Sequence, residues 1–219
     1  MGWRVGIVRV GVHHRHVPRG DPNPDYERLA HANRPTTDIW DAFVRRALVE
    51  PWLHAYRSAT PWRADVMEIA QEALSYLFDA APTMDGLEEG DDRVIAVWGH
   101  SRRAEGPRDP RRQAGFIPNP ATWSHRGRDR GHFVAHAAGG GMDMNFFPQA
   151  VGLNRGTTFQ GRVWKAMERH AIDHPGTALF VRPIYDDLSW VPASIDFGLL
   201  VEGRLRCEQF HNHDDPGEA

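Results

Sequence analysis

One histidine and two asparagines stand in a short polar stretch in the second half of the chain. His132 follows the charged segment Asp129-Arg130-Gly131, and Asn145 and Asn154 come after it. A neutral imidazole can take a proton from water near pH 7, because its unperturbed pKa is about 6.5. An asparagine carbonyl oxygen is a neutral, hard ligand that suits Mg²⁺. These residue types therefore predict metal-assisted attack of water on a phosphodiester.

Four segments around these residues follow one another in a recognisable order. They are Asp129 to His132, Asn145 to Gln149, Asn154 to Gly156, and Trp164 to Glu168. They resemble the Asp-Arg-Gly-His, Asn-x-x-Pro-Gln, Asn-x-Gly and Trp-x-x-x-Glu motifs of the non-specific DNA/RNA endonucleases, which have the beta-beta-alpha metal fold. The run Gly131 to Ala135, with Gly139 to Gly141 behind it, is most similar to the toxin-type branch of that superfamily. The resemblance extends from roughly Gly115 to Asn212, a little under half of the chain.

The resemblance implies a role for each motif residue. His132 corresponds to the general base that deprotonates the attacking water, and Asn154 to the protein ligand of a magnesium ion, for which manganese is a substitute. Arg130 and Glu168 are expected to act beside His132 as further catalytic residues. The other positions are expected to bind substrate (Arg128 and Arg155) or to give structural support (Asp129, Asn145 and Gln149).

Both central residues also have a plain structural interpretation. His132 taken alone would be a core histidine bonded to backbone, and it is the neighbouring motifs that favour catalysis. Asn154 taken alone would be a turn residue before Gly156, since asparagine tolerates left-handed backbone. The nine-residue step from Asn145 to Asn154 matches the spacing in the family and favours the metal ligand.

Glu168 departs from the family pattern. In the family the glutamate lies eight residues after the asparagine, whereas here Asn154 and Glu168 are fourteen residues apart. Fourteen residues of unbroken helix would span about 21 Å, so the two side chains could not then serve one ion. Two alternatives stay open. Either Gly161 breaks the helix and folds the insert out, or Glu168 is a solvated helix residue replaced at the site by Gln160 or water.

The composition fits one ordinary domain, or a small domain with an added helical layer. The 219 residues are 41% hydrophobic and 25% charged, and the formal net charge of −3 does not by itself indicate nucleic acid. A non-specific nuclease needs only a local basic groove, which a run of arginines before the motif would supply; solvated loop charges explain this run equally well. The run consists of Arg102, Arg103, Arg108, Arg111, Arg112, Arg126, Arg128 and Arg130.

Nothing in the sequence indicates secretion or a membrane span. Cys207 is the only cysteine, which excludes an internal disulfide and fits a reducing compartment. Residues Met1 to Val12 lack the continuous apolar segment of a signal peptide, and no stretch approaches the roughly 18 apolar residues of a membrane span. We therefore expect a cytoplasmic protein, or one delivered by a toxin export machinery that leaves no such mark.

Residues 1–92 are expected to form a mainly helical region packed on the core. Val5 to Val12 is predicted to be a strand. A first helix is predicted from Ile39 to Leu48, with Pro51 kinking or restarting it. A second helix is predicted from Thr60 to Leu77, because its first residues suit a cap and a first turn and an apolar stripe follows. Pro82 to Asp92 is predicted to be an acidic loop.

Residues 93–219 are expected to form the nuclease core. The predicted elements are a strand at Arg93–Trp98, a long loop at Gly99–Pro120, a helix at Arg162–Ile172, a strand at Ala178–Tyr185, and a hairpin of Ser194–Val201 with Arg204–Phe210. The hairpin should close at Glu202-Gly203. The fold class is therefore α+β: a beta-beta-alpha metal nuclease core with an antiparallel sheet and a helical N-terminal layer.

The sequence thus predicts a metal-dependent endonuclease that hydrolyses DNA, RNA or both with little sequence specificity, in a toxin, effector or defence setting. An immunity or regulatory protein is a further expected partner, and no membrane partner is expected. The alternative is a catalytically weak, nuclease-like module that binds nucleic acid or a partner protein. The intact His132 and Asn154 favour the enzyme, and the displaced Glu168 favours the module.

Overall fold

The structure is a computed structural model. It describes residues 24–63, 65–81, 83–84, 87–88, 90–107, 109 and 128–213. The strand expected at Val5–Val12 and most of the long loop expected at Gly99–Pro120 lie outside the described residues. The described part of that loop, 101–107, contains no helix or strand, as expected for a segment rich in glycine, proline and arginine.

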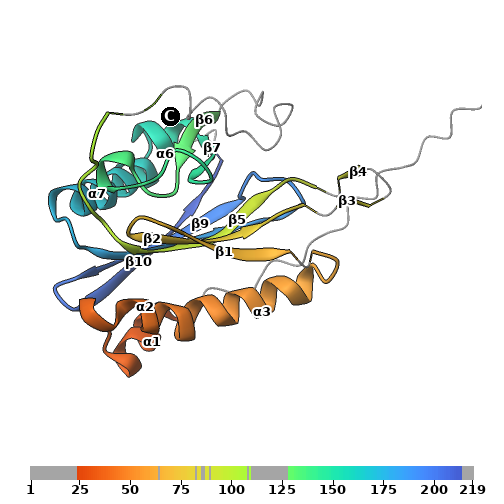
Figure 1. The fold of residues 1–219 in the computed structure, drawn as a ribbon. Coiled ribbons are helices and arrows are strands. Elements are labelled where there is room, and N and C mark those ends of the chain that lie inside the picture. The colour runs from red at the N-terminus through yellow and green to blue at the C-terminus, as the bar shows by residue number, and fades with distance from the viewer. Residues whose placement is uncertain are drawn as a thin grey trace, which may run out of the picture.

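A six-stranded antiparallel sheet forms the centre of the molecule (Figure 1). Its strands are β1 (Val66–Gln71), β2 (Leu74–Asp79), β5 (Arg93–His100), β8 (Ala178–Ile184), β9 (Ser194–Val201) and β10 (Arg204–His211), and they pair in this order. The strands predicted in the second half of the chain are confirmed. At the turn between β9 and β10, Glu202 and Gly203 both have positive φ, at 51° and 73°. Two successive positive φ values are typical of the tight hairpin turn that the sequence predicts there.

Three helices cover one face of the sheet (Figure 1). They are α1 (Tyr26–Asn33), α2 (Trp40–Val44) and α3 (Glu50–Ala59), with a short 3-10 turn at Thr37–Ile39 and a π-helical turn at Arg45–Val49. The prediction of a helix here with a restart near Pro51 is confirmed. Proline has no N–H to donate to the preceding turn, and the wider π-helical turn lies directly before α3, whose first positions hold Pro51.

The second helix predicted in this region is wrong. Residues 66–79 form the β1–β2 hairpin, in which Gln71 pairs with Leu74 across a turn where Glu72 has a φ of 60°. Leu74 packs on the face of the sheet opposite to that of Leu77, so the apolar residues never form one stripe. Thr60 ends α3 instead of starting a helix, and its hydroxyl donates to the carbonyl of Tyr56. The expectation of a mainly helical region up to residue 92 is therefore wrong for 66–79. The six-stranded sheet includes strands from before residue 92 and strands from after it.

The acidic segment Pro82–Asp92, predicted as a loop, contains two very short strands. β3 (Thr83–Met84) and β4 (Leu87–Glu88) pair as a separate two-stranded sheet. They lie apart from the six-stranded sheet at one end of the molecule (Figure 1).

The other face of the six-stranded sheet carries the motif region (Figure 1). A small hairpin of β6 (Arg128–His132) and β7 (Phe146–Ala150) leads into α6 (Val151–Arg155) and α7 (Phe159–Asp173). The helix predicted at Arg162–Ile172 is thus confirmed and extends a few residues further at its start. No helix in the described part of the chain combines the length and the apolar character that crossing a membrane requires.

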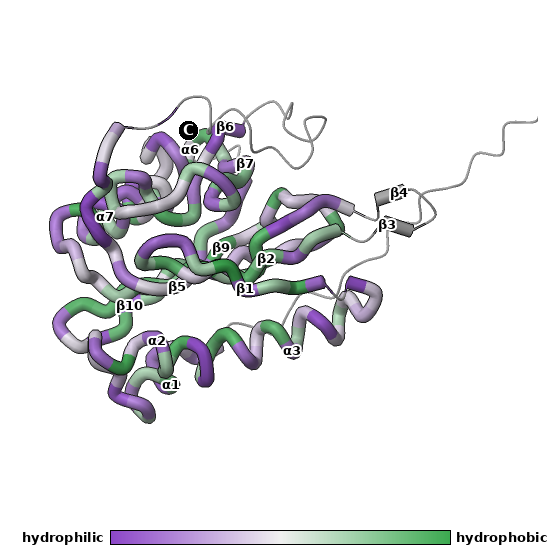
Figure 2. Tube along the Cα trace, viewed as in Figure 1, coloured by the Kyte–Doolittle hydropathy of each residue, from purple (hydrophilic) through white to green (hydrophobic). Residues whose placement is uncertain are grey.

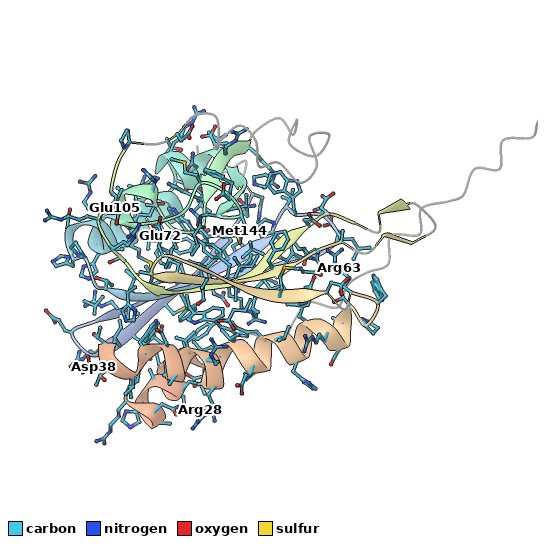
Figure 3. All side chains as sticks on the ribbon, viewed as in Figure 1. Arg28, Asp38, Arg63, Glu72, Glu105 and Met144 are labelled. Atoms are coloured by element: carbon cyan, nitrogen blue, oxygen red, sulfur yellow. The ribbon has the colours of Figure 1, made fainter. Side chains whose placement is uncertain are left out.

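Each face of the sheet has its own hydrophobic core. Under α1 to α3 the core includes Trp40, Trp52 and Phe180, and under the motif region it includes Phe133 and Trp164. Figure 2 shows hydrophobic and hydrophilic residues alternating along α3, as expected for a helix with one buried face. Figure 3 shows side chains filling the space on both sides of the sheet. The motif region is therefore packed on a buried hydrophobic core.

Candidate active site

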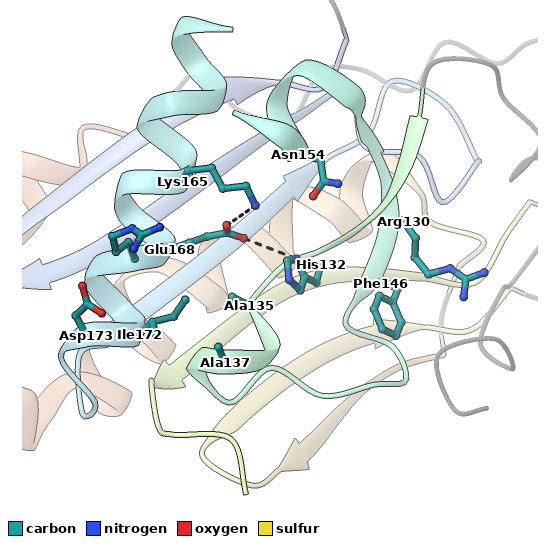
Figure 4. A pocket seen from close by; sticks show the side chains of 11 residues that line it. Arg130, His132, Ala135, Ala137, Phe146, Asn154, Lys165, Glu168, Ile172 and Asp173 are labelled. Atoms are coloured by element: carbon teal, nitrogen blue, oxygen red, sulfur yellow. Dashed lines mark hydrogen bonds and ion pairs between the residues drawn. The ribbon is translucent and has the colours of Figure 1, made fainter. Parts of the chain in front are cut away.

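A pocket of about 440 Å³ opens between the β6–β7 hairpin, α6 and α7 (Figure 4). Among the residues that line it are four that the sequence singles out: Arg130, His132, Asn154 and Glu168. They come from β6, α6 and α7, which are separate elements in the sequence. Their gathering at one pocket is the central geometric feature of the molecule.

His132 is the last residue of β6 and lies opposite Phe146 in the hairpin. The residue is buried, with 9% of its surface exposed. Its Nδ1 atom lies 3.7 Å from Oε1 of Glu168, and Figure 4 marks this contact. His132 is therefore not a plain core histidine, because it lies beside a carboxylate and lines an open pocket.

Gly131 and Gln149 pack closely in the hairpin that carries His132. A Cβ atom at Gly131 would lie 2.2 Å from Oε1 of Gln149, so no larger residue fits without displacing that side chain. Gln149 is fully buried, and within the described residues its amide makes no hydrogen bond. Gln149 therefore fills space in the hairpin, at the position that the sequence predicts to give structural support.

Asn145 holds together the loop between β6 and β7. Its Nδ2 donates to the carbonyl of Val134 at 2.8 Å and to that of Gly141 at 3.1 Å, while its Oδ1 accepts from the Val134 N–H at 3.0 Å. The residue is fully buried, so these bonds are shielded from water. Asn145 is thus a loop brace, as expected, and lies outside the pocket lining.

Asn154, in α6, has its amide oriented by Asp129. Its Nδ2 donates to Oδ2 of Asp129 at 3.0 Å, and Figure 4 shows the amide oxygen on the side of His132 and Glu168. Asp129 also binds Arg155 through two hydrogen bonds, of 2.7 and 2.8 Å. The Arg155 guanidinium holds the pKa of Asp129 below its usual range, and Asn154 contributes in the same direction. Asp129 therefore orients Asn154, a more specific role than the general support predicted for it.

Glu168 reaches the pocket because the chain turns sharply between Asn154 and α7. Gly156 ends α6 with a φ of 72°, and Thr158 caps α7 by accepting from the Gly161 N–H at 3.0 Å. The break therefore falls at Gly156, and the expectation that Gly161 breaks the helix is wrong. Gly161 lies inside α7 and allows the two helices to touch, since a Cβ there would lie 2.2 Å from the Gly152 carbonyl.

The environment of Glu168 excludes a solvated helix position. Only 6% of the residue is exposed. Oε2 of Glu168 accepts from the Lys165 ammonium at 2.7 Å, and Oε1 accepts no hydrogen bond within the described residues. Gln160, the alternative for this position, instead accepts from the His211 N–H at the edge of the sheet. The structure thus brings Glu168, and not Gln160, to the pocket.

The arginines expected to bind substrate lie in different environments. Arg130 lines the pocket. Arg128 donates to the carbonyl of Asn212 at 2.8 Å, which ties β6 to the end of β10, and Arg155 pairs with Asp129. Arg102 pairs with Glu72 and Glu105, which Figure 3 labels near one another. Neither Arg128 nor Arg155 lines the pocket, so their predicted contact with substrate has no support from the geometry.

Sequence reasoning missed two cationic residues of the pocket, Lys165 and Arg169. Both lie on α7 beside Glu168, at positions minus three and plus one. The spacing of Lys165 from Glu168 is a signal in the sequence, because side chains three apart on a helix are neighbours. This spacing indicates that Lys165 lies at the pocket only once α7 is known to face the pocket.

No protein-family model matches this chain, and no curated protein matches it in a sequence comparison. Among the described residues, no group of three or more histidine, cysteine, aspartate or glutamate side chains could hold a metal ion. A site that used one asparagine oxygen and one carboxylate would not form such a group. The function of the pocket is therefore to be inferred from its residues and their geometry.

Proposed function

We propose that this chain is a metal-dependent endonuclease that hydrolyses phosphodiester bonds of DNA, RNA or both. The observation that carries the proposal is the meeting of His132, Asn154 and Glu168 at one pocket. The three residues are the general base, the metal ligand and the glutamate of the motif pattern, and the fourteen-residue step from Asn154 to Glu168 is the departure from that pattern. The turn at Gly156 accommodates the longer step.

The proposed reaction is attack of a water molecule on phosphorus, with departure of the 3′-oxygen. His132 would take the proton of the attacking water, and the new bond to phosphorus would leave a 5′-phosphate on the product. A carboxylate facing Nδ1 favours the imidazole tautomer with its proton on Nδ1 and its lone pair on Nε2. Glu168 would therefore orient His132 as well as contribute negative charge to the pocket.

The donor atoms of the pocket fit a magnesium or manganese ion. The Asn154 amide oxygen faces the pocket, and the buried Glu168 carboxylate lines the same pocket, with its Oε2 turned to the half-exposed Lys165. Both are hard oxygen donors, and Mg²⁺ prefers such donors together with several water molecules. When bound, the ion would stabilise negative charge on the phosphate and on the leaving oxygen. By binding the Asn154 amide nitrogen, Asp129 would keep the Asn154 oxygen turned towards the ion.

The proposed substrate is the phosphate backbone, with little dependence on base sequence. Arg130 and Arg169 line the pocket, and an arginine guanidinium matches the geometry of phosphate oxygens. Contacts to phosphate position a nucleic acid without conveying sequence information. The toxin, effector or defence setting rests on the resemblance of Gly131 to Ala135 to toxin-type nucleases.

The test is cleavage of plasmid DNA and of a structured RNA by the purified chain, with Mg²⁺ and with excess chelator. We expect cleavage with Mg²⁺, none with chelator, and 5′-phosphate ends on the products. His132→Ala protein prepared in the same way controls for a contaminating nuclease. Cleavage that survives in chelator, or no cleavage of either substrate, would overturn the proposal.

One observation favours a second candidate, a nucleic-acid-binding module without catalysis. The Lys165 ammonium bonds the carboxylate that a metal ion would use. If that arrangement persists in the presence of Mg²⁺, the pocket holds phosphate by charge alone. Binding of a labelled oligonucleotide without cleavage, unchanged by Mg²⁺ or chelator, would identify the module.

A further inference from the structure

We propose that Lys165 competes with a divalent cation for Glu168 and, once displaced, binds a phosphate of the substrate. This inference rests on the proposed function, because it names a further substrate-binding residue of the same pocket. The contact on which it depends joins Nζ of Lys165 to Oε2 of Glu168 at 2.7 Å (Figure 4). Lys165 lies one turn before Glu168 on α7, and both line the pocket.

The two partners differ sharply in their contact with water. The Glu168 side chain is 7% exposed, whereas that of Lys165 is 40% exposed. A buried carboxylate needs a positive partner, because an uncompensated charge away from water is strongly unfavourable. Lys165 supplies that charge from the open side of the pocket. Any other cation that entered the pocket could supply it equally well.

Two cations cannot bind Glu168 without opposing each other. The repulsion between a divalent ion and an ammonium group at a given distance is twice that between two unit charges. Oε1 of Glu168 lies near His132, so Oε2 is the oxygen at which Lys165 and an ion would meet. Binding of the ion at Asn154 and Glu168 would therefore weaken the hold of Lys165.

A displaced Lys165 would still lie within the pocket. Its four-carbon stem is flexible and its ammonium is a compact point charge, which is the form in which lysine commonly binds phosphate. Arg130 and Arg169 line the same pocket, so Lys165 would join an existing set of positive groups. The exchange would make the Lys165 ammonium available to bind substrate only when a divalent ion occupies the site.

The test measures metal binding directly, by titration of Mn²⁺ with electron paramagnetic resonance detection of the free ion. We expect Lys165→Met to bind Mn²⁺ about threefold to tenfold more tightly than the wild type, the scale of one typical hydrogen bond. In cleavage assays the same variant should have a KM raised about tenfold. Lys165→Arg retains the positive charge and should change Mn²⁺ affinity and KM less than Lys165→Met does.

Arg162→Met is the matched control. Arg162 is on the same helix and carries the same charge, but it donates to the Thr157 carbonyl and does not line the pocket. Its loss should leave Mn²⁺ affinity unchanged, and circular dichroism establishes that each variant is folded. If Lys165 only held Glu168 in place, Lys165→Met would weaken Mn²⁺ binding instead of strengthening it.

The outcomes separate this inference from the proposed function. Mn²⁺ affinity of Lys165→Met equal to or weaker than that of the wild type, or no Mn²⁺ binding by either protein, overturns the competition. Tighter Mn²⁺ binding with an unchanged KM overturns the phosphate contact. Absence of cleavage by the wild type on both DNA and RNA overturns the proposed function, while the Mn²⁺ titration still decides whether Lys165 competes for Glu168.

Discussion

Nδ1 of His132 lies 3.7 Å from Oε1 of Glu168, although the two residues are on different elements, β6 and α7. Both side chains are largely buried, so the pair is held by the packing of the hairpin against the helix and not by chance contact at the surface. A carboxylate beside one ring nitrogen fixes the orientation of an imidazole and strengthens its other nitrogen as a base. The pair thus links the fold to the proposed chemistry.

We predict that His132→Ala lowers the rate of cleavage by about 10²–10⁴, the usual range for loss of a general base. Mn²⁺ binding should persist, because His132 is not a proposed ligand. Initial rates on plasmid DNA and RNA, with circular dichroism to check folding, provide the measurement.

His136→Ala is the control for the His132 variant. His136 begins a short 3-10 turn (His136–Ala138) after β6, where its ring nitrogens contact the carbonyls of Gly140 and Gly106, and it does not line the pocket. Its loss should have little effect on the rate of cleavage. Near wild-type cleavage by a folded His132→Ala protein would remove His132 from the mechanism.

We also predict that activity needs Mg²⁺ or Mn²⁺ and that Ca²⁺ does not replace them. The proposed protein ligands are few, namely the Asn154 oxygen and the Glu168 carboxylate, so water and phosphate would complete the coordination. Calcium favours more ligands at longer distances. Cleavage rates measured after chelation and return of each ion in turn decide the point, and full activity with Ca²⁺ alone would contradict it.

Much of the site could be predicted from the sequence because short motifs specify local geometry. The β6–β7 hairpin brings Asp129 opposite Gln149, and Asn145 reaches back eleven positions to the backbone of Val134. Such contacts span few residues. The position of Glu168 could not be settled in this way, because it depends on where the helix breaks, and the break falls at Gly156 instead of at Gly161, where we expected it.

The error in the N-terminal half has a different cause. Apolar residues from Val66 to Leu77 fall at helical spacing, but β2 packs on both faces of the sheet, and a bulge at Leu77 shifts the register of β2 against β5. A strand buried on both faces has no clear alternation, so periodicity alone does not separate it from a helix. What distinguishes the strand from a helix is its pairing with β5, which lies outside the segment with helical periodicity.

Asp129→Asn should lower activity about tenfold to a hundredfold, the range usual for residues that orient a metal ligand. Arg155→Met should have a smaller effect on activity, because it leaves the hydrogen bond from Asn154 to Asp129 in place. Cleavage rates of the two variants measured side by side test this. Equal losses would mean that the Arg155 pair, and not the orientation of Asn154, matters.

The same two variants, Asp129→Asn and Arg155→Met, should show the same pH dependence of stability relative to the wild type. Arg155 is the main cause of the lowered pKa of Asp129, and a carboxyl whose pKa is lower in the folded state contributes stability above its unfolded pKa of about 3.9. The contribution is lost as the pH falls from about 4 through the folded value. The wild type should therefore have a larger free energy of unfolding than either variant at pH 6, and this difference should become smaller as the pH falls. Urea unfolding at several pH values measures it, and a gap that is constant with pH would contradict the prediction.

Gly161→Ala should destabilise the protein, against the usual effect of this substitution in a helix. Alanine favours a helix interior over glycine by about 1 kcal/mol. Here the added Cβ would lie 2.2 Å from the Gly152 carbonyl, so α6 and α7 would be forced apart at a cost of about 1–3 kcal/mol. The shift would also move Asn154 away from Glu168, and a misplacement of about 1 Å can lower a rate ~10²-fold.

Gly106→Ala provides the comparison for Gly161→Ala, because a Cβ at Gly106 would meet no atom within 4 Å. That variant should unfold at nearly the wild-type urea concentration and cleave at nearly the wild-type rate. For Gly161→Ala both quantities should fall, and the loss of activity should exceed what the unfolded fraction explains. A Gly161→Ala protein that is more stable than the wild type and fully active would show that close contact between α6 and α7 is not what holds Asn154 and Glu168 at one pocket.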